Sequence, residues 1–163
     1  MTRRFVSVLG WGKSAPPHYE SVAYELDGER SSVTPFVQSA IVELEARSGT
    51  PFDEVVLLGT KEVNERWMHG ALTSDTALRN VVLEPAAPHR FVEVPNGRTS
   101  DELWTLFTAY TTAFGLKEPP SELVFDVTHG FRTQPMIGLS ALQFALSEWA
   151  RRGQAAPKVQ VLY

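Results

Sequence analysis

Residues 122–132, with the sequence ELVFDVTHGFR, bring an acid, a hydroxyl, an imidazole and a guanidinium together at the end of an apolar run. Side chains of these types can form a catalytic cluster, a metal site or an anion-binding loop, or can simply end a strand. Asp126 lies inside the apolar run, which favours a buried carboxylate that accepts backbone hydrogen bonds over a catalytic acid. His129 could act as a general base near neutral pH, or could donate hydrogen bonds to a phosphate or a base.

Other residues argue against metal and acyl-transfer chemistry. The chain has no cysteine, which excludes disulfides and thiolate metal sites, and it has no Gly-x-Ser-x-Gly elbow for a nucleophilic serine. The four histidines, His18, His69, His89 and His129, do not pair with the spacing of metal ligands. We therefore expect no metal and no cofactor, and favour recognition of phosphate or a nucleobase.

Composition and charge predict a single domain spanning residues 1–163. The chain has 163 residues, of which 43% are hydrophobic and 21% charged, as in globular proteins with a sizeable core. No apolar run approaches the ~20 residues that span a bilayer and no signal peptide is visible, so we expect a cytoplasmic protein without a membrane partner. A formal net charge of −4 argues against binding to duplex nucleic acid, but is compatible with a small phosphorylated ligand held by local cations.

Apolar runs typical of buried strands alternate with segments of helical periodicity. The strand-like runs cover residues 4–9, 54–59, 90–95, 122–127 and 158–163, and the helical segments cover residues 35–49, 99–115 and 135–153. Residues 60–83 are also predicted to be helical, with a break around Gly70. This alternation predicts a three-layer α/β fold with a mainly parallel sheet.

Capping and turn residues mark several boundaries of these elements. Thr99 and Glu102 form a Thr-x-x-Glu capping box at one helix start, and glycines end the three helical segments. Residues 21–33 contain two short strand-like runs around Asp27 and Gly28, a strong turn signal. We expect a β-hairpin inserted between the first strand and the first helix.

Four loops follow the predicted strands at the edge of the sheet where such folds bind ligands. They cover residues 10–14, 59–62, 95–99 and 128–132. Each has a glycine, which lets backbone amides approach an anion, and at least one cation for charge-assisted hydrogen bonds. The cations are Lys13, Lys61, Arg98, His129 and Arg132. Together the loops predict a phosphate-binding rim.

Familiar nucleotide motifs do not fit the first loop. Ser7 stands where a P-loop needs its first glycine, and the GWG sequence lacks the third glycine of the dinucleotide fingerprint. Gly10 and Gly12 are equally well explained by a tight turn after the strand.

The segment DVTHGFR resembles the Asp-x-Thr-His-Gly motif of CRISPR-associated Rossmann-fold (CARF) sensor domains. VLGWGKS and the hairpin resemble the first strand, phosphate loop and hairpin of that family. VPNGRTSDELWTLF is similar to its Pro-x-Gly-x-x-x-x-Glu-Leu-Trp segment, and VQVLY to its closing strand. The ordered set covers nearly the whole chain, and it implies a Rossmann-like fold.

The resemblance also implies a function and a set of binding residues. It implies a homodimer that binds a cyclic oligoadenylate, with cyclic tetra-adenylate preferred over hexa-adenylate, and that activates a downstream effector allosterically in type III CRISPR antiviral defence. The positions that match are Gly10, Trp11, Gly12, Lys13, Ser14, Gly59, Thr60, Lys61, Asn96, Gly97, Arg98, Thr128, His129, Gly130, Phe131 and Arg132. Trp11 or Phe131 is expected to stack on adenine, with packing at a dimer interface as the alternative for Trp11. Trp11 also departs from the family, where a small residue is common.

Three interpretations remain at this point. The first is a sensor without chemistry of its own, whose C-terminal effector domain lies beyond Tyr163. The second is a ring nuclease that cleaves its ligand by attack of a ribose 2′-hydroxyl, for which the candidates are Lys13, Ser14, Thr128 and His129. The third is an unrelated nucleotide-binding α/β domain.

Overall fold

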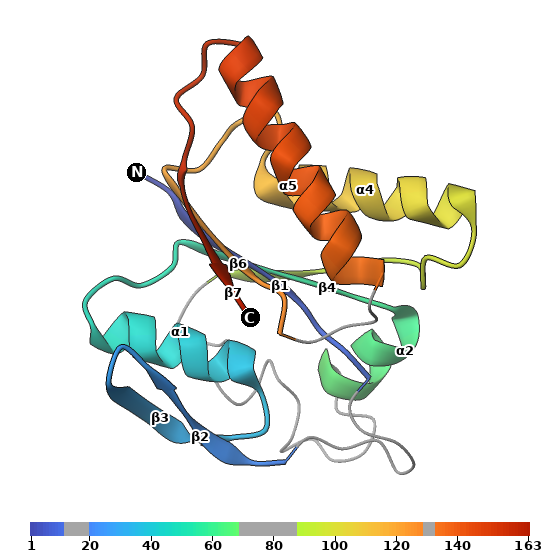
Figure 1. The fold of residues 1–163 in the computed structure, drawn as a ribbon. Coiled ribbons are helices and arrows are strands. Elements are labelled where there is room, and N and C mark those ends of the chain that lie inside the picture. The colour runs from blue at the N-terminus through green and yellow to red at the C-terminus, as the bar shows by residue number, and fades with distance from the viewer. Residues whose placement is uncertain (12–19, 69–87, 129–132) are drawn as a thin grey trace.

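A computed structural model describes residues 1–11, 20–68, 88–128 and 133–163 of the chain. Its centre is a sheet of five parallel strands in the order β5-β4-β1-β6-β7 (Figure 1). The strands are β1 Arg3–Val8, β4 Glu54–Gly59, β5 His89–Glu93, β6 Glu122–Asp126 and β7 Lys158–Leu162. The prediction of an α/β fold with a mainly parallel sheet is confirmed, and in this sheet every pairing is parallel.

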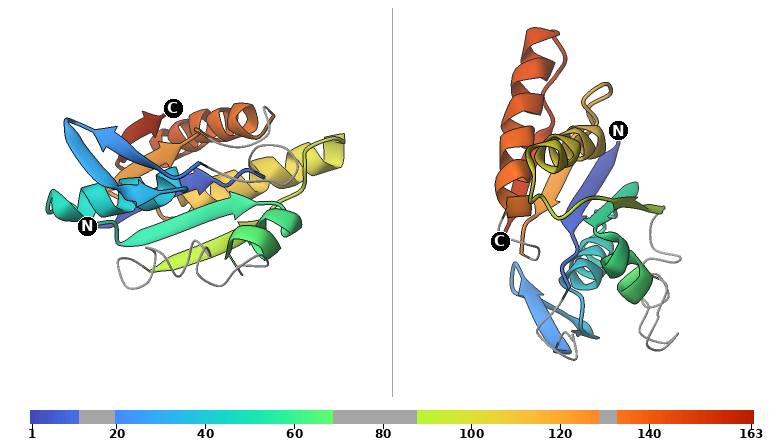
Figure 2. Two further views of the ribbon diagram at one scale, coloured as in Figure 1. Left: turned by 90° about the horizontal axis from the view of Figure 1, so that it is seen from below. Right: turned by 90° about the vertical axis from the view of Figure 1, so that its right-hand side faces the viewer.

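Helices cover both faces of the sheet, as the alternating pattern predicts. Helix α1, Val37–Arg47, lies on one face, whereas α4, Ser100–Phe114, and α5, Thr133–Arg151, lie side by side on the other (Figures 1 and 2). Because side chains alternate along a strand, Phe5 packs in the core on the α1 side and Val6 in the core beneath α4 and α5. None of the described helices is long and apolar enough to cross a membrane.

The antiparallel hairpin that the sequence predicts is present between β1 and α1. Strand β2, Val22–Leu26, pairs with β3, Glu29–Thr34, in a separate two-stranded sheet. Asp27 and Gly28 connect them with φ angles of 51° and 85°. Two positive φ angles in a two-residue loop suit the right-handed twist of a hairpin, which is why an Asp-Gly pair occupies this turn.

The predicted helical region after β4 is confirmed where the structure describes it. Thr60 caps the short helix α2, Lys61–Val63, through a hydrogen bond from the Val63 amide to the Thr60 hydroxyl. A π-helical turn, η1 Asn64–Met68, follows directly. The remaining predicted residues, including the break around Gly70, lie outside the described residues.

Capping residues set the ends of α4 much as the sequence predicts. The Glu102 amide donates to Thr99 Oγ1 at 3.2 Å, which satisfies a backbone group that would otherwise lack a partner. The Glu102 carboxylate accepts from the Arg98 amide at 2.6 Å, one residue before the position expected for a capping box. At the other end Gly115 adopts the left-handed conformation, with φ 84°.

Helix α5 passes unusually close to its neighbours at Gly138, which is buried. A Cβ atom at this position would lie 2.6 Å from Phe125 Cζ and 3.1 Å from the Tyr110 ring. Both rings are fully buried and pack edge to face against each other, with centroids 5.8 Å apart. Glycine is therefore needed here for packing, since neither ring can move aside.

We expect Gly138→Ala to destabilise the protein by about 1–3 kcal/mol, because overpacking outweighs the gain of about 1 kcal/mol from the higher helix propensity of alanine. Denaturant unfolding measures the difference. Ser140→Ala, at an exposed position of the same helix, is the matched control and should change the free energy of unfolding by less than about 0.5 kcal/mol. A stabilised Gly138→Ala variant would contradict this packing.

Candidate functional site

The four loops predicted to bind a ligand start at one edge of the sheet, formed by the carboxyl ends of its strands. Backbone hydrogen bonds extend the sheet into these loops. The Leu9 amide donates to the Leu58 carbonyl at 2.8 Å, and the Val94 amide donates to the Gly59 carbonyl at 2.9 Å. We call this region the carboxyl edge, and it is the expected ligand position in an open parallel sheet.

A buried polar cluster lies beneath the fourth loop. Asp126, the last residue of β6, is fully buried and is paired in register with Ser7 of the adjacent strand β1. Ser7 Oγ donates to Asp126 Oδ2 at 2.6 Å, and Gln38 Nε2 of α1 donates to Ser7 Oγ at 3.0 Å. Three elements that are distant in the sequence therefore meet at one carboxylate.

The same carboxylate fixes the start of the fourth loop. Asp126 Oδ1 accepts hydrogen bonds from both the amide, at 3.0 Å, and the hydroxyl of Thr128. Thr128 itself is exposed at the carboxyl edge. The prediction that Asp126 is a buried hydrogen-bond acceptor is confirmed, although among the described residues most of its partners are side chains and one is a backbone amide.

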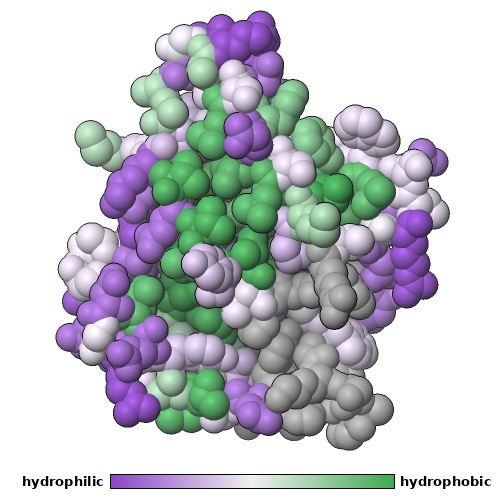
Figure 3. All heavy atoms as spheres, in the orientation of Figure 1, coloured by the Kyte–Doolittle hydropathy of each residue, from purple (hydrophilic) through white to green (hydrophobic). Residues whose placement is uncertain are grey.

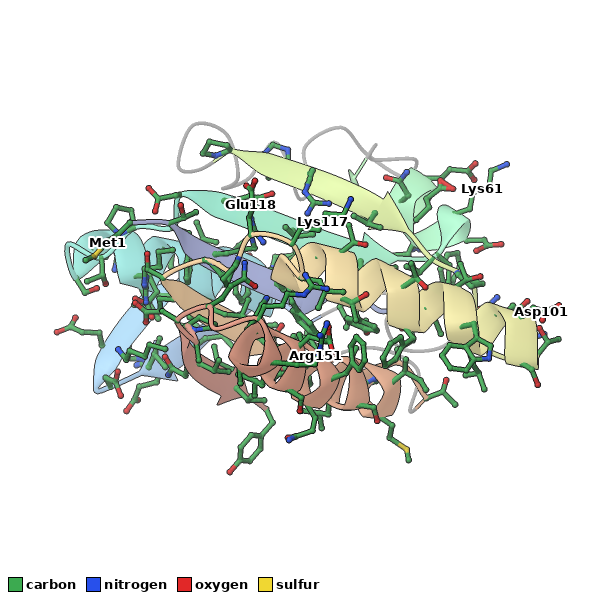
Figure 4. All side chains as sticks on the ribbon, turned by 90° about the horizontal axis from the view of Figure 1, so that it is seen from above. Met1, Lys61, Asp101, Lys117, Glu118 and Arg151 are labelled. Atoms are coloured by element: carbon green, nitrogen blue, oxygen red, sulfur yellow. The ribbon has the colours of Figure 1, made fainter. Side chains whose placement is uncertain are left out.

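The second loop combines a tightly packed glycine with an exposed cation. A Cβ atom on Gly59 would lie 2.9 Å from Val63 Cγ1 and 3.0 Å from Phe91 Cζ, so this glycine allows α2 to pack against the sheet. Thr60 is buried and caps α2. The Lys61 side chain is 72% exposed and extends outward from the carboxyl edge (Figure 4).

The third loop reaches back to the start of α5. Gly97 has a φ of 78°, and a Cβ atom there would lie 2.8 Å from Leu106 Cδ1 and 3.5 Å from Thr133 Oγ1. Because Thr133 is the first residue of α5, the third loop lies beside the point where the fourth loop ends. Asn96 is half-buried and Arg98 is exposed.

The first loop is described only at its beginning. Gly10 is buried, whereas Trp11 is 37% exposed. The Arg66 guanidinium of η1 lies 5.0 Å from the centroid of the Trp11 ring, a cation–π contact that joins the first loop to η1. The other predicted residues of these loops, Gly12, Lys13, Ser14, His129, Gly130, Phe131 and Arg132, lie outside the described residues.

Within the described residues, a carboxylate lies near one of the cations of the carboxyl edge. Lys61 Nζ lies 3.9 Å from Glu65 Oε1, and the exposed Glu93 ends β5 close to Arg98 in sequence. Hydrogen bonds from its own backbone and from Thr60 hold the pKa of Glu62 below its usual value. The other predicted cations, Lys13, His129 and Arg132, lie outside the described residues. The described residues contain no cluster of His, Asp and Glu that could hold a metal ion.

A cavity of about 250 Å³ opens beside the fourth loop, between the hairpin, α1 and β7. Its lining includes Tyr24, Ile41, Thr128 and Leu162. Burial, together with the nearby negative charge of Asp126, raises the pKa of Tyr24. The β2–β3 hairpin therefore lies next to the carboxyl edge of the sheet.

Sequence reasoning did not assign a role to Ser7, Gln38, Tyr24 or Arg66. Ser7 and Gln38 each carry a weak signal, since each is a polar residue at a position where its element is otherwise buried and apolar. Ser7 is 31 positions from Gln38 and 119 positions from Asp126 in the sequence. No local sequence pattern indicates hydrogen bonds between residues so far apart.

We expect Asp126→Asn to lower the free energy of unfolding by about 1–3 kcal/mol, because both carboxylate oxygens accept hydrogen bonds and an amide nitrogen would face a donor in either orientation. Denaturant unfolding provides the measurement. Ser7→Ala removes one of these donors and should cost less, about 1 kcal/mol. An Asp126→Asn variant that unfolds like the parent protein would show that the carboxylate is not structural.

One family of known proteins matches this chain. A family model described as the CARF domain of the CRISPR system endoribonuclease Csx1 matches residues 6–162, nearly the whole chain. No curated protein matches it. The matched range includes the starting residues of all four loops and the buried cluster at Asp126. The chain belongs to the Csx1 CARF domain family, which implies cyclic oligoadenylate sensing in type III CRISPR defence.

Proposed function

We propose that two copies of this chain bind one cyclic oligoadenylate ring at their carboxyl edges, and that binding activates an effector domain C-terminal to β7. The observation that carries the proposal is the convergence of four loops at one edge of the sheet in a member of the CARF family. A ring of repeated nucleotides matches a two-fold dimer, because each copy can present the same loops to half of the ring.

Specific residues have distinct roles in this proposal. The exposed Thr128 lies next to the ligand, and the Asp126 carboxylate holds its backbone in place before binding. Lys13, His129 and Arg132 supply positive charge and hydrogen bonds to phosphates. Arg66 contacts the Trp11 ring, and stacking of this ring on an adenine base is the role that we propose for it.

A path from the ligand to the effector follows from strand pairing. The Val127 amide donates to the Leu162 carbonyl at 2.9 Å, so the residue before Thr128 is hydrogen-bonded to the end of β7. A ligand that shifts the fourth loop therefore acts directly on the strand that leads to residue 163. Such a shift becomes a switch when the ligand has different affinities for two arrangements of the dimer.

We expect calorimetric titration with cyclic tri-, tetra- and hexa-adenylate to show tight binding to one ring, preferably the tetra-adenylate, at one ring per two chains. Mass spectrometry of the recovered ligand should show it intact. A linear product with a terminal cyclic phosphate would instead identify a ring nuclease, in which ribose 2′-hydroxyl attack opens the ring. Absence of binding to all three rings would contradict the proposed ligand.

We expect His129→Ala and Arg132→Glu each to weaken binding at least about tenfold, because each removes a charge-assisted or hydrogen-bonding contact to phosphate. Lys117→Glu, a charge reversal of equal size in the connection between α4 and β6, is the control and should bind normally (Figure 4). Unfolding curves confirm that each variant is folded. Unchanged affinity for the ligand in both variants would show that the fourth loop is not part of the binding site.

A further inference from the structure

Strand β5 is the outermost strand on one side of the five-stranded sheet (Figure 4). Among the described strands, β4 is its single neighbour, and its other side pairs with none of them. A free strand edge presents a row of unpaired amides and carbonyls, which is a template for pairing with a further strand. The edge of β5 is therefore a candidate interaction surface.

Pairing with β4 fixes which backbone groups of β5 face outward. Backbone hydrogen bonds to β4 flank the strand, at the Pro88 carbonyl and at the Val94 amide. In a parallel ladder alternate residues of a strand bond to the same neighbour, so the even-numbered residues of β5 bond to β4. The amides and carbonyls of His89, Phe91 and Glu93 therefore point away from the sheet.

The sequence of β5 is complementary to itself when two copies run antiparallel. With Phe91 opposite its own counterpart, His89 of each copy lies opposite Glu93 of the other. In each of these pairs both residues direct their backbone groups outward, as the hydrogen-bonded pairs of an antiparallel ladder require. An imidazole opposite a carboxylate is a favourable cross-strand pair, and two-fold symmetry forms it twice.

The side of β5 that faces α4 also suits a second copy. A groove of about 460 Å³ lies between β5 and α4, and its lining includes Arg90, Val92, Trp104 and Thr108. Trp104 is 69% exposed, which is unusual for so large a side chain. In the antiparallel register Arg90 of each copy lies beside Val92 of the other, so the second copy continues the floor of the groove. Arg90 Nε is 2.9 Å from Glu54 Oε1, so the two guanidinium groups are each neutralised within their own chain.

The opposite edge of the sheet does not have this complementarity. Strand β7 forms that edge, and Figure 3 shows apolar side chains gathered along β7 and α5. The one charged residue within β7 is Lys158, which lies 3.4 Å from Glu122 of the neighbouring strand β6. The edge of β7 therefore offers no pair of opposite charges that would set a register, whereas the edge of β5 does.

We propose that two copies of this chain pair antiparallel along β5, with Phe91 at the two-fold axis and the two sheets joined into one. This contact lies at the side of the sheet, whereas the proposed ligand site lies at its carboxyl edge. A chain can therefore make both contacts. Two different two-fold contacts on one chain join ligand-binding dimers into a larger assembly.

Sedimentation velocity over a wide range of concentration, without ligand, tests this contact by exchanging its charges. The parent chain should associate. His89→Glu and Glu93→Lys should each raise the dissociation constant of this association at least about fivefold, because each removes the pairing of imidazole with carboxylate. The double variant His89→Glu/Glu93→Lys restores opposite charges in this register, and its dissociation constant should return to within about twofold of the parent value. Glu29→Lys, the same charge change at an exposed residue of the hairpin, is the matched control and should leave the association unchanged.

A backbone variant tests the strand pairing itself. Because the Glu93 amide points outward, Glu93→Pro removes a hydrogen-bond donor of the contact and none of the sheet. Association should be lost in this variant, while its cooperative unfolding in denaturant shows that the domain is still folded.

The outcomes separate this inference from the proposed function. A parent chain that does not associate, or whose association neither single variant weakens, would overturn the contact even if cyclic oligoadenylates bind. A double variant that associates as weakly as the single variants would overturn the antiparallel register. Association that follows the charge exchange, in a chain that binds none of the three rings, would support the contact while the ligand proposal fails.

Discussion

The hydrogen bond between Ser7 and Asp126 joins β1 to β6 at the position on which the arrangement of the carboxyl edge depends. In the sheet, β4 and β5 lie on one side of β1, and β6 and β7, which come later in the chain, lie on its other side. In open parallel sheets the loops on either side of such a reversal diverge, and ligands bind in the crevice between them. A carboxylate buried there is stable only when its oxygens are hydrogen-bonded, and those partners come from β1 and the fourth loop.

The opposite edge of the sheet is stabilised by a different interaction. At the strand starts, Glu54 contacts Arg4 at 2.6 Å and Arg90 at 2.9 Å, while Glu122 contacts Arg3 at 3.1 Å. Burial opposes ionisation of Glu54, but hydrogen bonds and charge from Arg90 and Arg4 outweigh it and hold the pKa of Glu54 below its usual value. These ion pairs bridge neighbouring strands where no ligand is expected. Ion pairs thus connect neighbouring strands at the amino edge, whereas at the carboxyl edge the Ser7–Asp126 hydrogen bond connects β1 to β6.

The fold was predictable from the sequence because its signals are local. Buried strands, helix ends and the Asp27–Gly28 turn each depend on a few adjacent residues, and the structure confirms them. The site was predictable only as a set of loops. The pairing of Ser7 with Asp126, the contact of Arg66 with Trp11 and the carboxylate beside Lys61 depend on how distant segments meet. The absence of charge from residues 103–114 and 133–147 was visible in the sequence, but the exposure of Trp104 and Met136 follows only from the position of the two helices.

Helix α5 connects the proposed binding loop to the core of the sheet. Its first turn follows the fourth loop, and its buried side packs against β6 at Gly138. Close packing at Gly138 leaves little room for α5 to move independently of the sheet. In the proposed dimer, a ligand that displaced α5 would therefore displace the sheet with it as one body. Rotation of whole protomers against each other is a motion that preserves this packing.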